Sequence, residues 1–149
     1  MSFNVKGSEQ LAVLDVVNPS AQAAGAATTG WVSAAQFQKF LAVIQAGTFG
    51  ASATVDAKIQ QATSSAGAGA KDVTGKAITQ LLAAGGNNVQ AEINLDAQEL
   101  DVNGGFAYIQ LSVTVGTAAT GTSAVLLGLG GRLGPASDFN NASVAQIVG

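Results

Sequence analysis

The sequence predicts a mainly β protein: an antiparallel β-sandwich of jelly-roll or immunoglobulin-like type, with one or two short helical connectors and extended terminal arms. Two observations predict this class. Several segments alternate apolar and polar residues with a period of two, as half-buried antiparallel strands do. Glycine-rich turns separate these segments at the short spacing that is typical of sandwiches.

Three segments alternate clearly, and each predicts a strand with one buried face: 52–60, 89–95 and 106–115. In the longest of them, 106–115, Ile109 and Leu111 point to one side, whereas the polar residues between them point to the other. A one-residue shift of register would exchange the two faces, so the alternation also predicts which side chains form the core.

Three further runs are apolar on both faces, namely 11–17, 37–44 and 123–129. Such runs are compatible with a buried strand or a buried helix. The glycines that close or precede the second and third runs favour strands, and we interpret all three runs as strands. With the alternating segments, the expected strands of the central region lie near 37–46, 52–61, 88–95, 105–116 and 122–130.

One helix is predicted at 77–84. Ile78, Leu81 and Leu82 stand at positions i, i+3 and i+4, which places them on one face of a helix, and Gly85 follows as a C-terminal stop. This helix would be a short connector on the β body.

A second helical connector is expected at 96–100, where Asp96 and Glu99 have the spacing of a capping box. The same carboxylates, with Asp101 and Asn103, also suggest a calcium site, because hard cations bind several oxygen ligands. The spacing does not fit the twelve-residue calcium loop of EF-hands. The sequence therefore favours a capped helical turn with solvated carboxylates, and no metal is predicted.

The two ends of the chain differ from the middle, and they suggest a division into an N-terminal strand with an arm or loop (1–35), a sandwich core (36–134) and a C-terminal arm (135–149). Neither 18–35 nor 135–149 has a convincing period. Such segments either become ordered on a neighbouring molecule or pack back on their own domain. Their isolated apolar side chains are the candidate anchors for a partner: Phe3, Trp31, Phe139 and Ile147.

Composition argues against several classes of function. The chain contains no cysteine and no histidine, which removes disulfides, thiolate chemistry and the usual general base and metal ligand. We therefore expect no enzyme activity and no cofactor. The net charge of −3 gives no reason to expect binding to nucleic acid. No apolar run of 18 residues and no signal peptide is visible, so no membrane association is expected.

Three stretches of the chain resemble small structural proteins that are encoded in the head-gene clusters of tailed phages. The resemblance covers roughly residues 37–136. The matching residues are 40–47 with 54–62, then 69–76, and finally Leu100-Asp101, 105–109, 127–132 and Pro135. The sequence departs from this group around the second stretch, because it has Ser64, Ser65 and alanines where members carry more acidic and aromatic residues.

The resemblance implies a component of a virion that is assembled in the host cytoplasm, namely a decoration or cement protein on the capsid exterior. Its expected partners are the major capsid protein or another virion protein, and further copies of itself as a homo-oligomer in the particle. Two other hypotheses stay open: a neck- or tail-associated virion protein, and a carbohydrate-binding β-sandwich. The latter usually needs exposed aromatic rings, and this chain has a single tryptophan and a single tyrosine.

Overall fold

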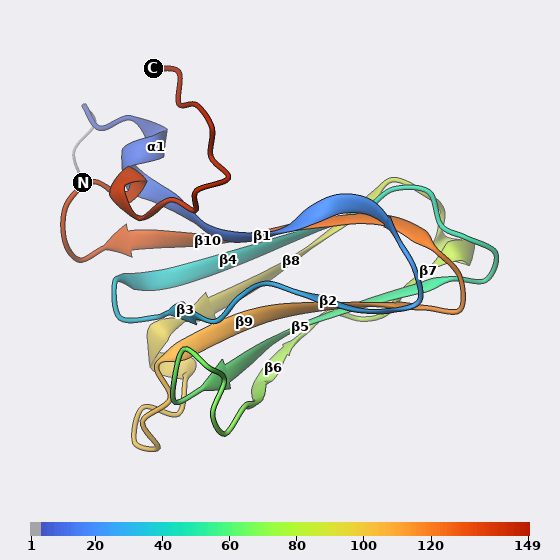
Figure 1. Ribbon diagram of the computed structural model, residues 1–149, viewed down its shortest axis with the longest axis horizontal. Helices are drawn as coiled ribbons and strands as arrows, with labels where there is room; N and C mark the ends of the chain where they lie inside the picture. The colour runs from blue at the N-terminus through green and yellow to red at the C-terminus, as the bar shows by residue number, and fades with distance from the viewer. Residues whose placement is uncertain (1–3) are drawn as a thin grey trace.

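The computed structural model describes residues 4–149, which form two antiparallel sheets that face each other (Figure 1). Sheet A contains four strands in the spatial order β1 (Leu11–Gln22), β10 (Thr120–Gly131), β4 (Phe37–Ala46) and β8 (Val89–Asp96). Sheet B has the order β2 (Gly25–Thr28), β9 (Tyr108–Gly116), β5 (Thr54–Ala62) and β6 (Lys71–Ala77), with β3 (Val32–Ser33) beside β9 and β7 (Leu81–Leu82) beside β5. The prediction of an antiparallel β-sandwich is confirmed.

The strand order is that of a jelly roll. Pairs form between β1 and β10, β2 and β9, β4 and β8, and β5 and β6, so the first long strand pairs with the last and each next one with its counterpart. This is the arrangement of one long hairpin that is rolled up until β4 meets β10 and β5 meets β9. The order decides between the two sandwich types that the sequence allowed.

The short strand β3 continues β2 along β9 after an interruption. Between β2 and β3, the backbone N–H of Thr29 still donates to the carbonyl of Leu111 at 3.0 Å. The hydroxyl of Thr29 then accepts the N–H of Leu111, also at 3.0 Å. This buried side chain therefore replaces a backbone acceptor where the strand bends away, and β2 and β3 together form one edge of sheet B.

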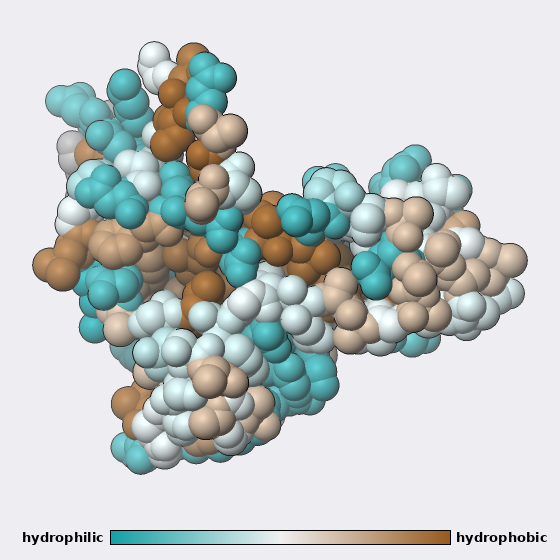
Figure 2. Space-filling model, viewed as in Figure 1, coloured by the Kyte–Doolittle hydropathy of each residue, from teal (hydrophilic) through white to brown (hydrophobic). Residues whose placement is uncertain are grey.

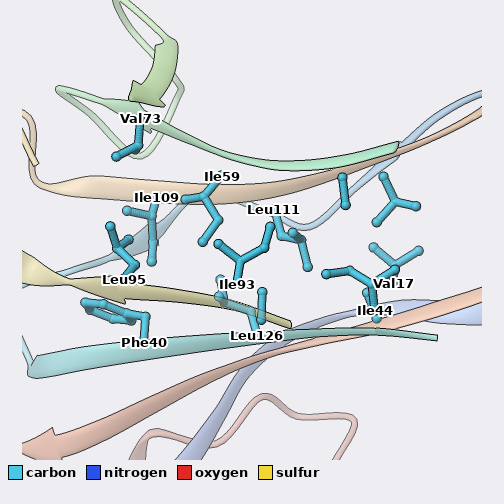
Figure 3. Packing of buried hydrophobic residues seen from close by; sticks show 14 of the residues in the cluster. Val17, Phe40, Ile44, Ile59, Val73, Ile93, Leu95, Ile109, Leu111 and Leu126 are labelled. Atoms are coloured by element: carbon cyan, nitrogen blue, oxygen red, sulfur yellow. The ribbon is translucent and has the colours of Figure 1, made fainter. Parts of the chain in front are cut away.

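The core lies between the two sheets and consists of the inward side chains of both (Figure 3). Ile59, Ile109 and Leu111 of sheet B face Phe40 and Leu126 of sheet A, and all five are at most 2% exposed. Burial of this apolar area supplies the main driving force for folding. The alternation in the sequence therefore predicted both the strands and the buried face of β5 and β9.

Helices are short connectors: α1 (Gly7–Gln10), η1 (Ala83–Gly85), η2 (Ala97–Glu99) and η3 (Ala136–Phe139). The predicted turn after β8 is confirmed as η2, and the capping box joins Asp96 and Glu99 in both directions. No helix in residues 4–149 has the length and apolar character needed to cross a membrane.

The predicted helix at 77–84 is wrong. The backbone N–H of Ile78 donates to Ala57 and that of Ala83 donates to Ala53, so this segment follows the edge of β5 as an extended chain. β7 and η1 take up its second half. Residues 78–80 connect β6 to β7 without regular secondary structure, and the side chains of Ile78 and Leu81 both pack against the core.

The segment 18–35, which lacks a period, contains the end of β1 and the whole of β2 and β3. Its strands are short and rich in Ala, Gly and Thr, so no alternation of large apolar residues marks them. β1 itself pairs with β10 from Leu11 to Gln22, with irregularities after Val13 and Val17. The N-terminal part of the chain thus contributes strands to both sheets.

Candidate interaction surface

The outward side of sheet A is apolar across three adjacent strands. The register places Val13 opposite Leu127 and Leu127 opposite Leu41 in one row, and Val16, Val125 and Val43 in the next. We call this surface the sheet A face; its side chains are Leu11, Val13 and Val16 of β1, Leu41 and Val43 of β4, and Val125, Leu127 and Leu129 of β10. All eight are partly exposed, and none belongs to the buried cluster.

These three strands are the three runs that are apolar on both faces in the sequence. Their inward residues fill the core, and their outward residues form the sheet A face. In the space-filling view, hydrophobic residues gather over β1, in the hollow between the C-terminal segment and the loops at the opposite end (Figure 2). A contiguous apolar patch of this kind on a protein surface marks an interaction site.

The outward side of sheet B is different in character. There Asp56 lies opposite Thr114, Lys58 opposite Ser112, and Gln60 opposite Gln110. The edge strand β8 of sheet A also turns polar residues outward, and these form one rim of the sheet A face. The apolar surface is therefore confined to β1, β10 and β4.

A groove of about 560 Å³ continues the sheet A face at its polar end. Ser123, Gln45 and Gln90 form the row beyond the valines, and Pro19 and Ser20 of β1 line the opposite wall. The hydroxyl of Ser123 donates to the side-chain oxygen of Gln45 at 3.4 Å. The described residues that line this groove carry no charged side chain, and their side-chain hydrogen-bonding groups are amides and hydroxyls.

The start of the C-terminal segment is fastened to the free edge of β1. The backbone N–H of Val13 donates to the side-chain oxygen of Asn140 at 2.7 Å, and the N–H of Asn141 donates to the carbonyl of Val13 at 2.7 Å. The Asn141 amide also donates to Asp15 at 3.3 Å, and Asp15 accepts the N–H of Gly30 at 2.7 Å. The first two bonds satisfy the backbone N–H and carbonyl of Val13 at the open edge of sheet A.

Beyond this attachment, residues 142–149 form a segment that we call the C-terminal tail. It contains no charged side chain. Ile147 is 48% exposed and Val148 is 84% exposed. Figure 1 shows the tail leaving the body near β1 and extending away from the sheets. It therefore presents apolar side chains that the rest of its own chain leaves exposed.

Phe3 lies outside the described residues. The other three candidate anchors occupy different places. Trp31 is partly buried in the connection between β2 and β3, and its ring lies against Gly67. Phe139 packs edge-on against Phe37, with ring centroids 5.6 Å apart, and closes the end of the core. Ile147 is the exposed one, and it lies in the C-terminal tail.

The acidic cluster at 96–101 forms ion pairs with lysines. Its carboxylates pair as follows: Asp96 with Lys39 at 2.9 Å, Glu99 with Lys76 at 2.9 Å, and Asp101 with Lys71 at 2.7 Å. Within residues 4–149, no three acidic side chains come together as a metal site would require. The arrangement is the capped turn that the sequence favoured, with the addition that each carboxylate has a lysine partner.

Two of these carboxylates have lowered pKa values. For Glu99, the backbone N–H of Asp96 is the main cause of the lowered pKa, and the Lys76 ammonium adds to it. For Asp101, the Lys71 ammonium is the main cause, followed by the N–H of Gly104. Both side chains stay charged at neutral pH and hold the connection after β8 in place.

The sequence reasoning missed the sheet A face as a site. Its signal was present, because the outward residues of an antiparallel strand are normally polar, and in these three runs they are apolar. What the sequence alone could not provide was the fact that 11–17, 37–44 and 123–129 become neighbours in one sheet.

Comparison with known proteins gives likeness of structure only. No family model and no curated protein sequence matches the chain. A chain of the naturally empty particles of cowpea mosaic virus aligns over 88% of this chain and 95% of its own, with 12% identity and a TM-score of 0.47. A chain of broad bean stain virus aligns over 91% of this chain and 95% of its own, with 10% identity and a TM-score of 0.45. The SPBc2 prophage-derived protein YomS aligns over 79% of this chain and 93% of its own, with 10% identity and a TM-score of 0.43. These likenesses do not assign a function.

Proposed function

We propose that this chain is a non-enzymatic structural protein of a virion, and specifically a capsid decoration or cement protein that binds assembled capsomers through apolar and backbone contacts. The resemblance to structural proteins of phage head-gene clusters supports this proposal. The observation that carries it is the C-terminal tail, which is fastened to β1 at Asn141 and then exposes uncharged, apolar residues.

The geometry of the tail suits attachment to a neighbouring surface. Because the preceding residues are held by Asn140 and Asn141, the tail starts from a fixed point on the sandwich. The eight residues of the tail reach about 26 Å when extended. Burial of Ile147 and Val148, with backbone hydrogen bonds to a strand edge of the partner, would offset the cost of ordering the tail.

The experiment is co-sedimentation with assembled capsids that lack this protein. Ile147→Asp removes an apolar anchor and adds one negative charge to the tail. Gln146→Asp is the matched control, because it adds the same charge at the neighbouring exposed position. We expect the natural chain and Gln146→Asp to sediment with the capsids, and Ile147→Asp to remain largely in solution while its melting temperature is unchanged.

Three results would count against the proposal. Failure of the natural chain to bind capsids would reject the decoration function, and binding to duplex DNA at physiological salt would point to a different partner. Equal capsid binding by Ile147→Asp and Gln146→Asp would show that the tail is not the attachment segment. A neck- or tail-associated role predicts binding to those structures in place of the capsid shell.

A second candidate function is supported by the groove beside the sheet A face. Its neutral amides and hydroxyls, such as Gln45, Gln90 and Ser123, are groups that bind sugar hydroxyls. However, the single tryptophan of the chain is not among the residues that line it. Titration of the ¹⁵N-labelled protein with cellopentaose tests this function. Shifts confined to the groove that disappear in Gln90→Leu would support it, and an unchanged spectrum would reject it for this ligand.

A further inference from the structure

We infer that the sheet A face is the interface between two copies of this chain, which associate by stacking their A sheets face to face. The inference deepens the proposed function by naming the partner of a second surface, and its meaning for a particle rests on that function. Self-association itself is a property of the isolated protein and is measured without a capsid.

The first argument is the pattern of burial on β4 and β10. In β4, Phe40, Ala42 and Ile44 are buried and alternate with Leu41 and Val43, which are partly exposed. β10 has the same alternation, with apolar residues on both sides. An antiparallel sheet with one solvated face normally turns polar residues outward, whereas runs that are apolar on both sides are typical of sheets covered on both faces. Sheet B covers the inner face of sheet A, and the apolar residues on the outer face favour a second apolar layer there.

The second argument is the charge distribution. The two central rows of the face consist of valines and leucines only, so an identical face can approach without placing like charges opposite each other. Charges lie on both sides of these rows. On the side of β8, Lys39 and Asp96 form an ion pair at 2.9 Å and Glu92 lies opposite Val43. On the side of β1, Asp15 accepts hydrogen bonds from Gly30 and Asn141. A strongly charged partner would find no complementary group at the centre.

The third argument is area. The four strands of sheet A, spaced about 4.8 Å apart, span roughly 19 Å, and ten residues of β4 extend about 33 Å. The whole outward side of sheet A, which consists of the sheet A face and the polar rim on β8, therefore measures roughly 600 Å² before the relief of the side chains is counted. A stable interface buries about 800 Å² of accessible surface on each partner. A second sheet of the same size matches this whole outward side, whereas a single extended peptide would cover about one quarter of it.

Stacked sheets lie about 10 Å apart with their strands within about 30° of one another, as in the sandwich itself. The dimer would therefore be a four-layer stack in which both B sheets face outward and carry the polar surface. Each copy would keep its own C-terminal tail. Two tails on one dimer bind a capsid more tightly than a single tail, because the second attachment is intramolecular.

The test is the mass of the isolated protein in solution, measured by light scattering and sedimentation velocity over a concentration series. The natural chain should approach twice its mass of 14.6 kDa as the concentration rises. Val43→Lys places a charge at the centre of the face and should be a monomer. Thr114→Lys is the matched control, because Thr114 is exposed on a central strand of sheet B, opposite Asp56. It should dimerise as the natural chain does.

A second variant separates loss of the interface from misfolding of Val43→Lys. Val43→Thr combined with Val125→Thr keeps shape and strand propensity but makes the centre of the face polar. It should weaken the dimer by about tenfold or more at an unchanged circular dichroism spectrum. A natural chain that stays monomeric at every concentration would overturn the inference, as would folded Val43→Lys that dimerises like Thr114→Lys. Neither result would bear on capsid attachment through the tail, which the sedimentation experiment measures separately.

Discussion

Val43 of β4 lies directly opposite Val125 of β10, on the outward side of sheet A. The residues next to them, Ile44 and Ala124, are also directly opposite one another and are buried in the core. Two neighbouring rows of apolar pairs therefore point in opposite directions from the same two strands. One row stabilises the fold, and the other is available for assembly.

The register of β9 makes a simple stability prediction. Leu111 is fully buried, whereas Thr114 on the same strand is exposed. Leu111→Ala should lower the free energy of unfolding by about 2–5 kcal/mol, because it leaves a cavity between the sheets. Thr114→Ala should change it by less than about 1 kcal/mol. Urea unfolding followed by circular dichroism measures both, and equal losses would contradict the register.

Gly67 is predicted to be essential for the position of the single tryptophan. Its φ of +80° is left-handed, and a Cβ at this position would lie 2.5 Å from the ring nitrogen of Trp31. Gly67→Ala should therefore displace the indole and shift its fluorescence emission. Gly75→Ala is the control, because Gly75 has a similar φ of +75° and nothing within 4 Å of its Cβ position.

Both glycine variants should lose roughly 1–2 kcal/mol of stability from backbone strain. Only Gly67→Ala should change the emission spectrum, so the comparison separates strain from the contact with Trp31. An unchanged spectrum in folded Gly67→Ala would show that the loop does not pack on the indole.

The two candidate anchors of the C-terminal segment, Phe139 and Ile147, should differ in their contribution to stability. Phe139→Ala removes the edge-on contact with Phe37. We expect it to lower the free energy of unfolding by about 2–3 kcal/mol. This loss is smaller than for a fully buried ring, because Phe139 is partly exposed. Ile147→Ala should leave stability unchanged. Deletion of residues 142–149 should likewise leave the melting temperature unchanged, whereas deletion of 136–149 should lower it.

Equal melting temperatures for the two deletions would contradict the packing of Ala136 and Phe139 against the core. A loss of stability in the shorter deletion would mean that the tail itself belongs to the folded domain.

Acid should weaken the attachment of β6. The Lys58 ammonium, helped by the Gln60 amide, lowers the pKa of Asp72 below its ordinary value of 3.8. Glu99 and Asp101, which pair with the lysines at the two ends of β6, also have lowered pKa values. A group whose pKa is lower in the folded state stabilises that state above its unfolded pKa and loses this effect as the pH falls through its folded pKa.

Stability should therefore decline below about pH 4.5, the ordinary value for a glutamate, and continue to decline as Asp72 and Asp101 are protonated. Because all three carboxylates are exposed, the decline should be modest. The urea midpoint as a function of pH measures it. Asp72→Asn should flatten the decline, and an unchanged pH profile in this variant would exclude the Lys58 pair as a contributor.

Sequence patterns predicted the fold wherever burial is one-sided or complete. The alternation around Ile59 and Ile109 identified β5 and β9 together with their inward faces, and the capping box of Asp96 and Glu99 identified η2. The patterns failed where tertiary hydrogen bonds override local spacing. Ile78 is held in an extended segment by the carbonyl of Ala57, which is distant in the sequence.

The candidate site was harder to predict than the fold for the same reason. Phe139 and Ile147 are both isolated apolar residues near the end of the chain, and only the contact with Phe37 separates the core residue from the exposed one. The sheet A face depends on pairing between β1 and β10, whose partner residues are about one hundred positions or more apart. Local periodicity contains no information about such pairing.

A cryo-electron microscopy map of the assembled particle tests the central claim most directly, namely that the sheet A face and the C-terminal tail are assembly surfaces. We predict density for this chain on the capsid, with Val43 and Val125 covered by the A sheet of a second copy and Ile147 buried against a capsid subunit. A particle without this chain, or a bound chain whose sheet A face and tail both point into solvent, would contradict the claim.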